Sequence, residues 1–222
     1  KTDYIDLYQL HWSSRDIPFE ETMEAMEILK EQGKIRSIGV CNFGEKDLTE
    51  LLQISSVQTN QMAYNLIWRA IEFSVKEKCV ENDIGILCYS PIAQGLLTGK
   101  YLTADEVPEG RARTWHFSGA RQNARHGSEG CEQETFEAIE KIREVADDLR
   151  VSMADLSLAW LIHQQGVTSV LAGGRNSEQV RQNSVAADIE LSSDIIQMLK
   201  DVTEPLKNKL GDNPDMWSDR IR

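Results

Sequence analysis

Polar and aromatic side chains recur in this sequence at the points where short, strand-like stretches end. The stretch YIDLYQLH, residues 4–11, is rich in aromatic and β-branched residues and ends at His11, next to Trp12. Four more stretches end on residues of the same kind, namely Cys41 and Asn42, Asn60 and Gln61, Tyr89 with Ser90 and Pro91, and Gly173 with Gly174 and Arg175. These side chains hydrogen-bond or stack and are poor fillers of an apolar core. They are therefore the first candidates for a functional site.

Each of these residues also has an ordinary structural interpretation. His11 could be a buried histidine with satisfied hydrogen bonds, and Tyr89 could be a core aromatic with a paired hydroxyl. Asn42 and Gln61 could cap helices or satisfy loop backbone, and the glycines of AGGRN could only form a turn. The recurrence of polar groups at the same end of successive strands favours a shared pocket, because a barrel brings those ends together.

The segment AGGRNSEQVRQN, residues 172–183, has the chemistry of an anion site. Two glycines and Arg175 come just before an expected helix, which Asn176 or Ser177 would cap. Backbone N–H groups and the helix dipole attract an anion there, and a guanidinium is suited to phosphate. A phosphate site after the final strand is common in (β/α)8 barrels.

Strand-like stretches alternate with helical stretches about five times along the chain. The strands are expected at residues 4–11, 37–40, 57–60, 85–90 and 168–173. The helices are expected at residues 19–34, 44–55, 70–83, 134–149, 154–164, 177–187 and 192–206. This alternation predicts parallel βαβ units, and short strands such as SIGV are apolar on both faces, as buried strands must be.

Two α/β architectures fit this pattern, an open doubly wound sheet and a (β/α)8 TIM barrel. The open sheet should carry a glycine-rich phosphate turn, but no G-x-G-x-x-G occurs, and GLLTGK, residues 95–100, is one residue too short for a P-loop. We therefore favour the barrel. A closed barrel needs eight units, so residues 1–222 are expected to form a single domain with roughly the last five of them. The N-terminal units are expected to be absent, and the piece alone is expected to be inactive.

The composition excludes several classes of function. A formal net charge of -12 argues against nucleic-acid binding, which needs a basic surface. No apolar run is long enough to cross a membrane, and the 41% hydrophobic content is enough for a sizeable core. The 4 cysteines show no close spacing, and no histidine spacing suggests a metal site. Reduced thiols fit a cytoplasmic protein.

A long polar segment, residues 102–130, shows little periodicity and is expected to be an irregular loop with a functional or mobile role. Within it, RARTWHFSG places Arg113, Trp115, His116 and Phe117 close together. They could form a substrate wall or a clamp over a cofactor, or they could be incidental aromatics of a surface loop.

Five segments in this order resemble the aldo-keto reductases, in particular the bacterial branch that includes general stress reductases. The segments are DLYQLHW, SIGVCNF, VQTNQMAYN, YSPIAQGLLTGKY and LAGGRNSEQVRQN. The resemblance implies a (β/α)8 barrel that binds NADP(H) without a Rossmann fold. It also implies reduction of aldehydes or ketones to alcohols, with a small-molecule carbonyl compound as the substrate.

The resemblance also assigns roles to individual residues. His11 corresponds to the active-site histidine that orients and polarises the carbonyl. Cys41, Asn42 and Gln61 correspond to residues that hold the nicotinamide carboxamide, although a serine is usual in place of Cys41 and a thiol hydrogen-bonds weakly. Tyr89 corresponds to the aromatic that stacks on the nicotinamide. The pyrophosphate loop is represented by Ser90, Pro91, Gly95, Leu96 and Lys100, and the segment around the 2′-phosphate and adenine by Gly173, Arg175, Gln179, Gln182 and Asn183.

The resemblance predicts NADPH as the preferred cofactor. Because some family members carry an arginine where this chain has Gln179, NADH is left open. The family's catalytic Asp, Tyr and Lys come from strands before the His11 strand and are expected to be missing from this chain. Two alternatives to the reductase remain: a non-catalytic NADP(H)-binding regulatory or scaffold protein on the same barrel, and a metal-dependent barrel hydrolase.

Overall fold

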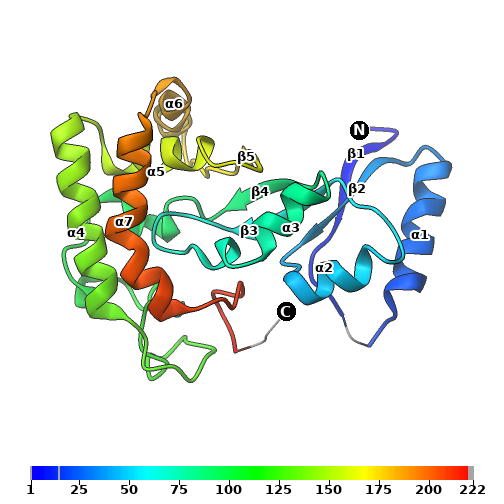
Figure 1. The fold of residues 1–222 in the computed structure, drawn as a ribbon, viewed down its shortest axis with the longest axis horizontal. Coiled ribbons are helices and arrows are strands. Elements are labelled where there is room, and N and C mark those ends of the chain that lie inside the picture. Colours follow the sequence, from blue (N-terminus) through cyan, green and yellow to red (C-terminus); the bar gives the residue numbers. More distant parts are fainter. Residues whose placement is uncertain (1, 15, 220–222) are drawn as a thin grey trace.

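The computed structural model describes residues 2–14 and 16–219, and it contains a five-stranded parallel sheet (Figure 1). Each strand pairs with the next in parallel, so the order in space follows the order in the chain. The strands are β1 (Ile5–Leu10), β2 (Ile35–Cys41), β3 (Thr59–Ala63), β4 (Gly85–Tyr89) and β5 (Val167–Val170). This confirms the predicted parallel βα units, which are the building blocks of a (β/α)8 barrel. Within the described residues, β1 and β5 are the edges of the sheet.

Seven α-helices connect and cover the strands in the described part of the chain. They are α1 (Phe19–Glu31), α2 (Glu45–Leu51), α3 (Val75–Glu81), α4 (Glu132–Leu149), α5 (Met153–Ile162), α6 (Ser177–Val185) and α7 (Ser193–Leu210). Short 3-10 turns lie at η1 (Ala70–Glu72), η2 (Ala93–Thr98), η3 (Ala104–Glu106) and η4 (Ala186–Asp188). Met23 and Met26 of α1 are buried, and their spacing of three residues places them on the same face of the helix. The described residues contain no helix that is both long and apolar enough to cross a membrane.

The third strand differs from its predicted bounds. It was expected at residues 57–60 but runs from Thr59 to Ala63, so Gln61 lies inside the strand and pairs with Cys41 of β2. Just before β3, the Ile38 backbone N–H donates to the Gln58 side-chain oxygen at 2.9 Å, whereas the Gln58 backbone N–H donates to the Ile38 carbonyl at 2.8 Å. The last strand also ends early, at Val170, so residues 171–174 form an exposed connection to α6.

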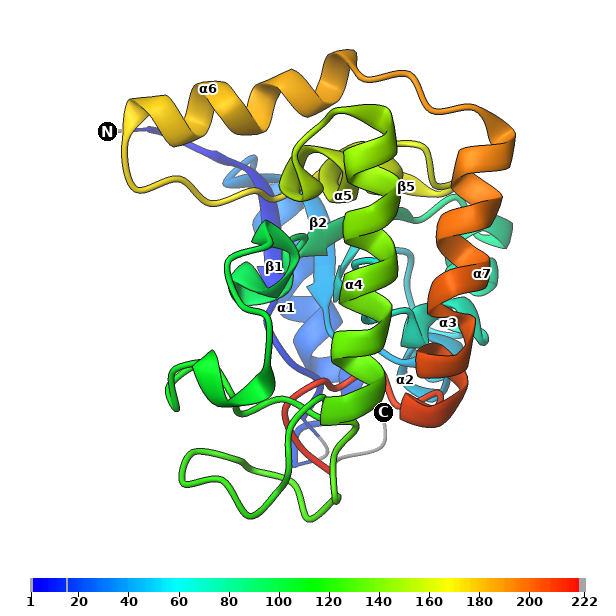
Figure 2. The same ribbon diagram turned by 90° about the vertical axis from the view of Figure 1, so that its left-hand side faces the viewer.

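Three helices form a layer beside the sheet. Helix α4 packs against α7 and α5, and Figure 2 shows α4 and α7 running side by side. Leu156, Trp160 and Leu161 of α5 are fully buried, whereas no residue of α6 is buried. The connection after β3 is fixed to α7 by Arg69, whose guanidinium donates to Thr203 Oγ1 at 2.9 Å and to Glu204 at 2.9 Å.

The segment 102–130, called the long loop below, is irregular apart from η3, as expected. It lies against the tail, residues 211–219, at the end of the molecule where β1 ends (Figures 1 and 2). The backbone N–H of Trp115 donates to the Met216 carbonyl at 3.3 Å, and Arg125 forms an isolated β-bridge with Ser218. Ala112 and Phe117 are fully buried and belong to the same hydrophobic core as the strands and helices, so the loop is packed onto the rest of the molecule.

Candidate active and cofactor-binding site

His11 directly follows the C-terminal end of β1 and is exposed to solvent. Its ring centroid lies 5.7 Å from that of Trp12, with the planes tilted by 48°. The interpretation of His11 as a buried histidine is therefore wrong. An exposed imidazole at a strand end can meet a ligand, and its backbone carbonyl is held by the Asn42 side-chain N–H at 3.3 Å.

Asn42 connects three strand ends by hydrogen bonds. It has a left-handed backbone with φ 60°, a conformation that asparagine tolerates better than most residues, and it is buried. Its amide nitrogen donates to the His11 carbonyl, and its side-chain oxygen accepts the Tyr89 hydroxyl at 2.8 Å. Its backbone N–H donates to the Gln61 carbonyl at 2.9 Å. The structure thus brings His11, Asn42, Gln61 and Tyr89 together, as expected for one mouth of a barrel.

Gln61 and Cys41 complete this group. The Gln61 side chain donates to the Gln9 side chain on β1 at 3.1 Å, across β2. Cys41 is buried, and burial raises the pKa of its thiol to about 11, so the sulfur stays protonated near neutral pH. A buried neutral thiol is a weak hydrogen-bond donor, so Cys41 contributes packing more than ligand recognition. Asn60 is also buried, but it binds both backbone groups of Phe43 and serves the structure.

The loop after β4 is shaped by left-handed residues. Ser90, Gln94 and Gly95 have φ values of 52°, 55° and 98°. Pro91 and Leu96 are buried beneath it, and the Ser90 carbonyl is fixed by the Asn65 side chain at 3.0 Å. A Cβ added at Gly95 would lie 3.3 Å from Lys100 Nζ and 3.5 Å from Arg111 Nη1. Two cationic groups therefore flank the left-handed backbone turn at Gly95, an arrangement that suits a phosphate group.

The connection from β5 to α6 begins with a capped helix. Asn176 caps α6 by accepting the Gln179 backbone N–H at 2.9 Å, and Gln179 Oε1 accepts the Arg175 backbone N–H at 2.9 Å. The Asn183 side chain donates to the Gly173 carbonyl at 3.1 Å. The side chains of Gln179 and Asn183 are thus used in local structure, while the Arg175 guanidinium is exposed at the helix N-terminus. Gln182 is exposed as well.

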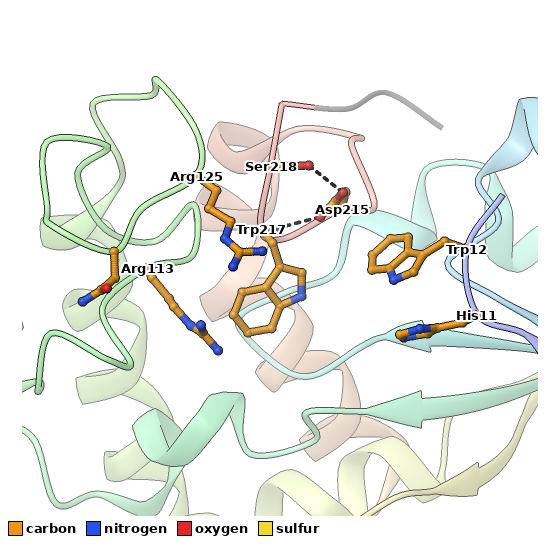
Figure 3. A pocket seen from close by; sticks show the side chains of 8 residues that line it. His11, Trp12, Arg113, Arg125, Asp215, Trp217 and Ser218 are labelled. Carbon is orange, nitrogen blue, oxygen red and sulfur yellow. Dashed lines mark hydrogen bonds between the residues drawn. The ribbon is translucent and has the colours of Figure 1, made fainter. Parts of the chain in front are cut away.

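A pocket of about 690 Å³ lies between β1 and the loop–tail pair (Figure 3). His11 and Trp12 lie on one side of it, and Arg113, Arg125 and Trp217 lie on the other. Asn123, Asp215 and Ser218 complete the lining. A cavity of this size holds a small organic molecule. Its position beside His11 makes it the candidate substrate pocket.

The four residues singled out in RARTWHFSG play different parts. Arg113 lines the pocket. His116 and Phe117 are buried, with the His116 ring against the Ile67 carbonyl and Trp68, and Trp115 stacks on His126 with centroids 5.4 Å apart. The sequence did not predict a role for Arg125, Asp215, Trp217 or Ser218, because the long loop and the tail show no periodic pattern. The available signal was Trp217, an isolated tryptophan in a polar tail.

The described residues contain no group of three or more His, Cys, Asp or Glu side chains that could hold a metal ion. All four cysteines are free and buried. The polar groups that the described site does contain are amides, an imidazole, a phenol and cationic side chains.

The chain is similar in sequence and in fold to known proteins of one family. Residues 1–204 match the family described as "Aldo/keto reductase family". The chain is 34% identical over 209 residues to an NADH-specific methylglyoxal reductase of Escherichia coli, covering 92% of this chain, and 33% identical over 213 residues to the aldo-keto reductase YhdN of Bacillus subtilis, covering 96% of it. The solved structure of an aldo-keto reductase from Klebsiella pneumoniae in complex with NADPH superposes with a TM-score of 0.67 at 30% identity, covering 91% of this chain and 60% of that one. The chain spans 61% of the length of each of the two curated relatives.

Proposed function

Because the chain belongs to the aldo/keto reductase family, we propose that it carries the cofactor-binding face of an NADP(H)-dependent enzyme that reduces aldehydes or ketones to alcohols. The observation that supports this most directly is the hydrogen-bonded group of His11, Asn42, Gln61 and Tyr89, which lie at or near the carboxyl ends of four strands. We propose further that residues 1–222 act as one domain, the C-terminal five units of a barrel.

The residues present fit a nicotinamide dinucleotide. Beyond the bonds to His11 and Gln9, the second amide N–H of Asn42 and the Oε1 of Gln61 can serve a planar carboxamide, and Tyr89 offers a partly buried ring beside them. Gln94 Nε2 is buried without a hydrogen-bond partner in the described structure, next to the Gly95 turn flanked by Lys100 and Arg111. Buried donors without partners are rare in proteins, and a ligand oxygen would satisfy this one.

Each group then has a part in binding. Asn42 and Gln61 would orient the nicotinamide, and the turn from Ser90 to Lys100 would hold the pyrophosphate. Arg175 at the N-terminus of α6 would hold a 2′-phosphate, with Gly173, Gln179, Gln182 and Asn183 shaping its surroundings. The hydride for the carbonyl carbon would be supplied by the cofactor when it is bound. His11 would donate a hydrogen bond to the carbonyl oxygen as negative charge develops there.

The choice between NADPH and NADH depends on Arg175. Among the relatives, one is named for NADH and one solved structure holds NADPH, so both cofactors occur in this family. An exposed guanidinium beside a capped helix N-terminus favours the cofactor with the additional phosphate. The free cysteines fit the reducing cytosol, which is where we place the protein.

The test is the loss of NADPH absorbance with a panel of aldehydes and ketones, using the protein that contains residues 1–222 and its His11→Ala variant. Reduction that falls in His11→Ala supports the proposal. NADPH binding without turnover of any carbonyl compound would contradict it and favour a non-catalytic binding protein. Loss of activity with a chelator would contradict it in favour of a metal-dependent enzyme.

A further inference from the structure

Two guanidinium groups line the wall of the substrate pocket opposite His11 (Figure 3). We propose that the pocket takes an aldehyde or ketone that also bears an anionic group, a carboxylate or a phosphate, held by Arg113 and Arg125 while its carbonyl meets His11. This inference rests on the proposed carbonyl reduction, and it adds the class of substrate.

The four arginines of the long loop differ in the groups that surround their side chains. Arg121 is paired with Glu132 at 2.7 Å and with Glu109 at 3.4 Å, and Arg111 donates to the Tyr101 hydroxyl at 2.9 Å. Arg113 and Arg125 face the pocket, and no carboxylate of the described residues forms an ion pair with either of them. Arg121 is neutralised by acidic partners, whereas Arg113 and Arg125 have no acidic partner among the described residues. Two cations of this kind are suited to an anionic ligand.

Arg113 is held in place without being neutralised. Its guanidinium carbon lies 4.9 Å from the centroid of the Trp217 ring, and its Nε is buried with no hydrogen-bond partner among the described residues. A ring face positions a planar cation and leaves its outer N–H groups available to a carboxylate or phosphate. A buried N–H group without a partner is rare, and an anionic ligand bound to this guanidinium would supply an acceptor.

The pocket wall is anchored on both sides. The neighbours of Arg113, Ala112 and Thr114, are buried, and the Trp115 indole donates to the Ser218 carbonyl at 3.3 Å. The backbone N–H of Gly127, two residues after Arg125, donates to Asp219 at 3.1 Å. Cations fixed before the ligand arrives bind at a lower entropic cost than those on a free loop.

The acidic side chain in the lining is Asp215, and it is hydrogen-bonded within the tail. Its Oδ1 accepts the Trp217 backbone N–H at 3.0 Å, and its Oδ2 accepts the Ser218 hydroxyl at 2.7 Å (Figure 3). Asp215 is buried, whereas Arg125 is exposed. The formal charge of the described lining is therefore positive, two guanidinium groups against one carboxylate, in a chain with a net charge of -12. A local cluster of this kind selects anions despite the overall repulsion.

The test compares matched substrates that differ in the anionic group. Succinic semialdehyde is compared with butyraldehyde for the carboxylate, and glyceraldehyde 3-phosphate with glyceraldehyde for the phosphate. We expect kcat/KM to be at least about tenfold higher for a charged member than for its neutral partner, and the advantage to shrink as salt is added. The pair with the larger ratio identifies the anion.

The variants are Arg113→Met and Arg125→Met, with Lys141→Met as the control because Lys141 is an exposed cation on α4. Each pocket variant should lower kcat/KM for the charged aldehyde about tenfold more than for its neutral partner, mostly through KM. Arg125→Lys should recover part of the loss. Arg125 is exposed, so its variants report on the pocket even if Arg113→Met fails to fold.

The outcomes separate this inference from the proposed function. Reduction of both members of each pair with equal efficiency overturns the anionic pocket and leaves the reductase standing. A rise in KM for NADPH instead of the aldehyde overturns it in favour of a cofactor clamp. If no carbonyl compound is reduced, quenching of tryptophan fluorescence by the same compounds decides: selectivity for the charged member that Arg125→Met abolishes supports the pocket, and its absence overturns it.

Discussion

The hydroxyl of Tyr89 donates a 2.8 Å hydrogen bond to the side chain of Asn42, across the strand that separates them. Tyr89 ends β4 and Asn42 follows β2, so the bond spans β3 at the carboxyl end of the sheet. The same Asn42 amide holds the His11 carbonyl at 3.3 Å. One asparagine thus sets the relative positions of the candidate catalytic histidine and the candidate stacking ring.

This relationship predicts the effect of Tyr89→Phe. The ring remains, but Asn42 loses one hydrogen bond and with it part of its orientation. A net hydrogen bond contributes about 0.5–1.5 kcal/mol, so the Kd for NADPH should rise by up to about tenfold. Fluorescence titration of NADPH measures this. A Tyr89→Phe protein that binds NADPH as tightly as the wild type, while Tyr89→Ala does not, would show that only the ring matters.

Arg175→Met should weaken the binding of NADPH but not that of NADH. The Arg175 side chain is exposed, and the contact of this residue with Gln179 is made by its backbone, so the α6 cap survives the substitution. Loss of a charge-assisted contact to a 2′-phosphate should weaken NADPH about tenfold and leave NADH unchanged. The matched control is Arg181→Met, because Arg181 pairs with Glu178 on the surface of the same helix. Equal losses for NADPH and NADH would remove the 2′-phosphate from this position.

His116 predicts a pH dependence of stability. The ring is fully buried between the Ile67 carbonyl at 2.9 Å and the Thr114 hydroxyl at 3.0 Å, and burial lowers its pKa from 6.5 to about 4. Below pH 6.5 the imidazole of His116 takes up a proton in the unfolded chain but stays neutral in the folded chain until the pH approaches 4. Stability should therefore be fully present above pH 6.5 and fall by roughly 1.4 kcal/mol per pH unit toward pH 4.

Urea unfolding of the wild type and of His116→Gln over this range measures the effect. The variant should be less stable at neutral pH, but it should lack the part of the slope that His116 contributes. Parallel slopes in the two proteins would mean that the imidazole is protonated in the folded state.

Arg69→Met should destabilise the contact between the β3 connection and α7. Arg69 is buried, and its guanidinium donates to Glu72 at 2.7 Å and to the Lys200 carbonyl at 2.8 Å. Burial raises the pKa of Glu72, but the hydrogen bonds and charge of Arg69 outweigh it and the net pKa is lowered. Removing Arg69 would leave Glu72 as a largely buried carboxylate without its main partner, at a loss of about 3–5 kcal/mol.

Arg36→Met is the control for Arg69→Met, since Arg36 forms an exposed pair with Asp6 at 3.0 Å. Its free energy of unfolding should change by no more than about 1 kcal/mol. A similar loss in the two variants would show that burial of the Arg69 network has no special weight.

The sequence predicted the order and type of the elements because those signals are local. Met23 and Met26 mark the core face of α1 by their spacing, and the alternation of strands with helices indicates a parallel sheet. The bounds of β3 were not predictable in this way. Strand bounds are set by hydrogen bonds between segments that are distant in sequence, such as those that join Ile38 and Gln58.

The sequence predicted only the part of the candidate site that local patterns mark. The strand ends identified His11, Asn42, Gln61 and Tyr89, which the structure brings together. The far wall of the pocket, with Trp217 of the tail, depends on tertiary contacts between the loop and a tail that no local pattern connects. Functional residues on irregular segments are the ones that periodicity cannot find.

The central claim is that the carboxyl ends of these strands bind a nicotinamide dinucleotide, and Asn42→Ala tests it most directly. The measurement is an NADPH titration of the wild type, Asn42→Ala and the surface control Gln133→Ala, with the far-ultraviolet circular dichroism of each protein as the check on folding. The account predicts saturable binding to the wild type and to Gln133→Ala, and binding at least about tenfold weaker to a folded Asn42→Ala. Equal affinity in all three proteins, or no saturable binding to the folded wild type, would contradict it.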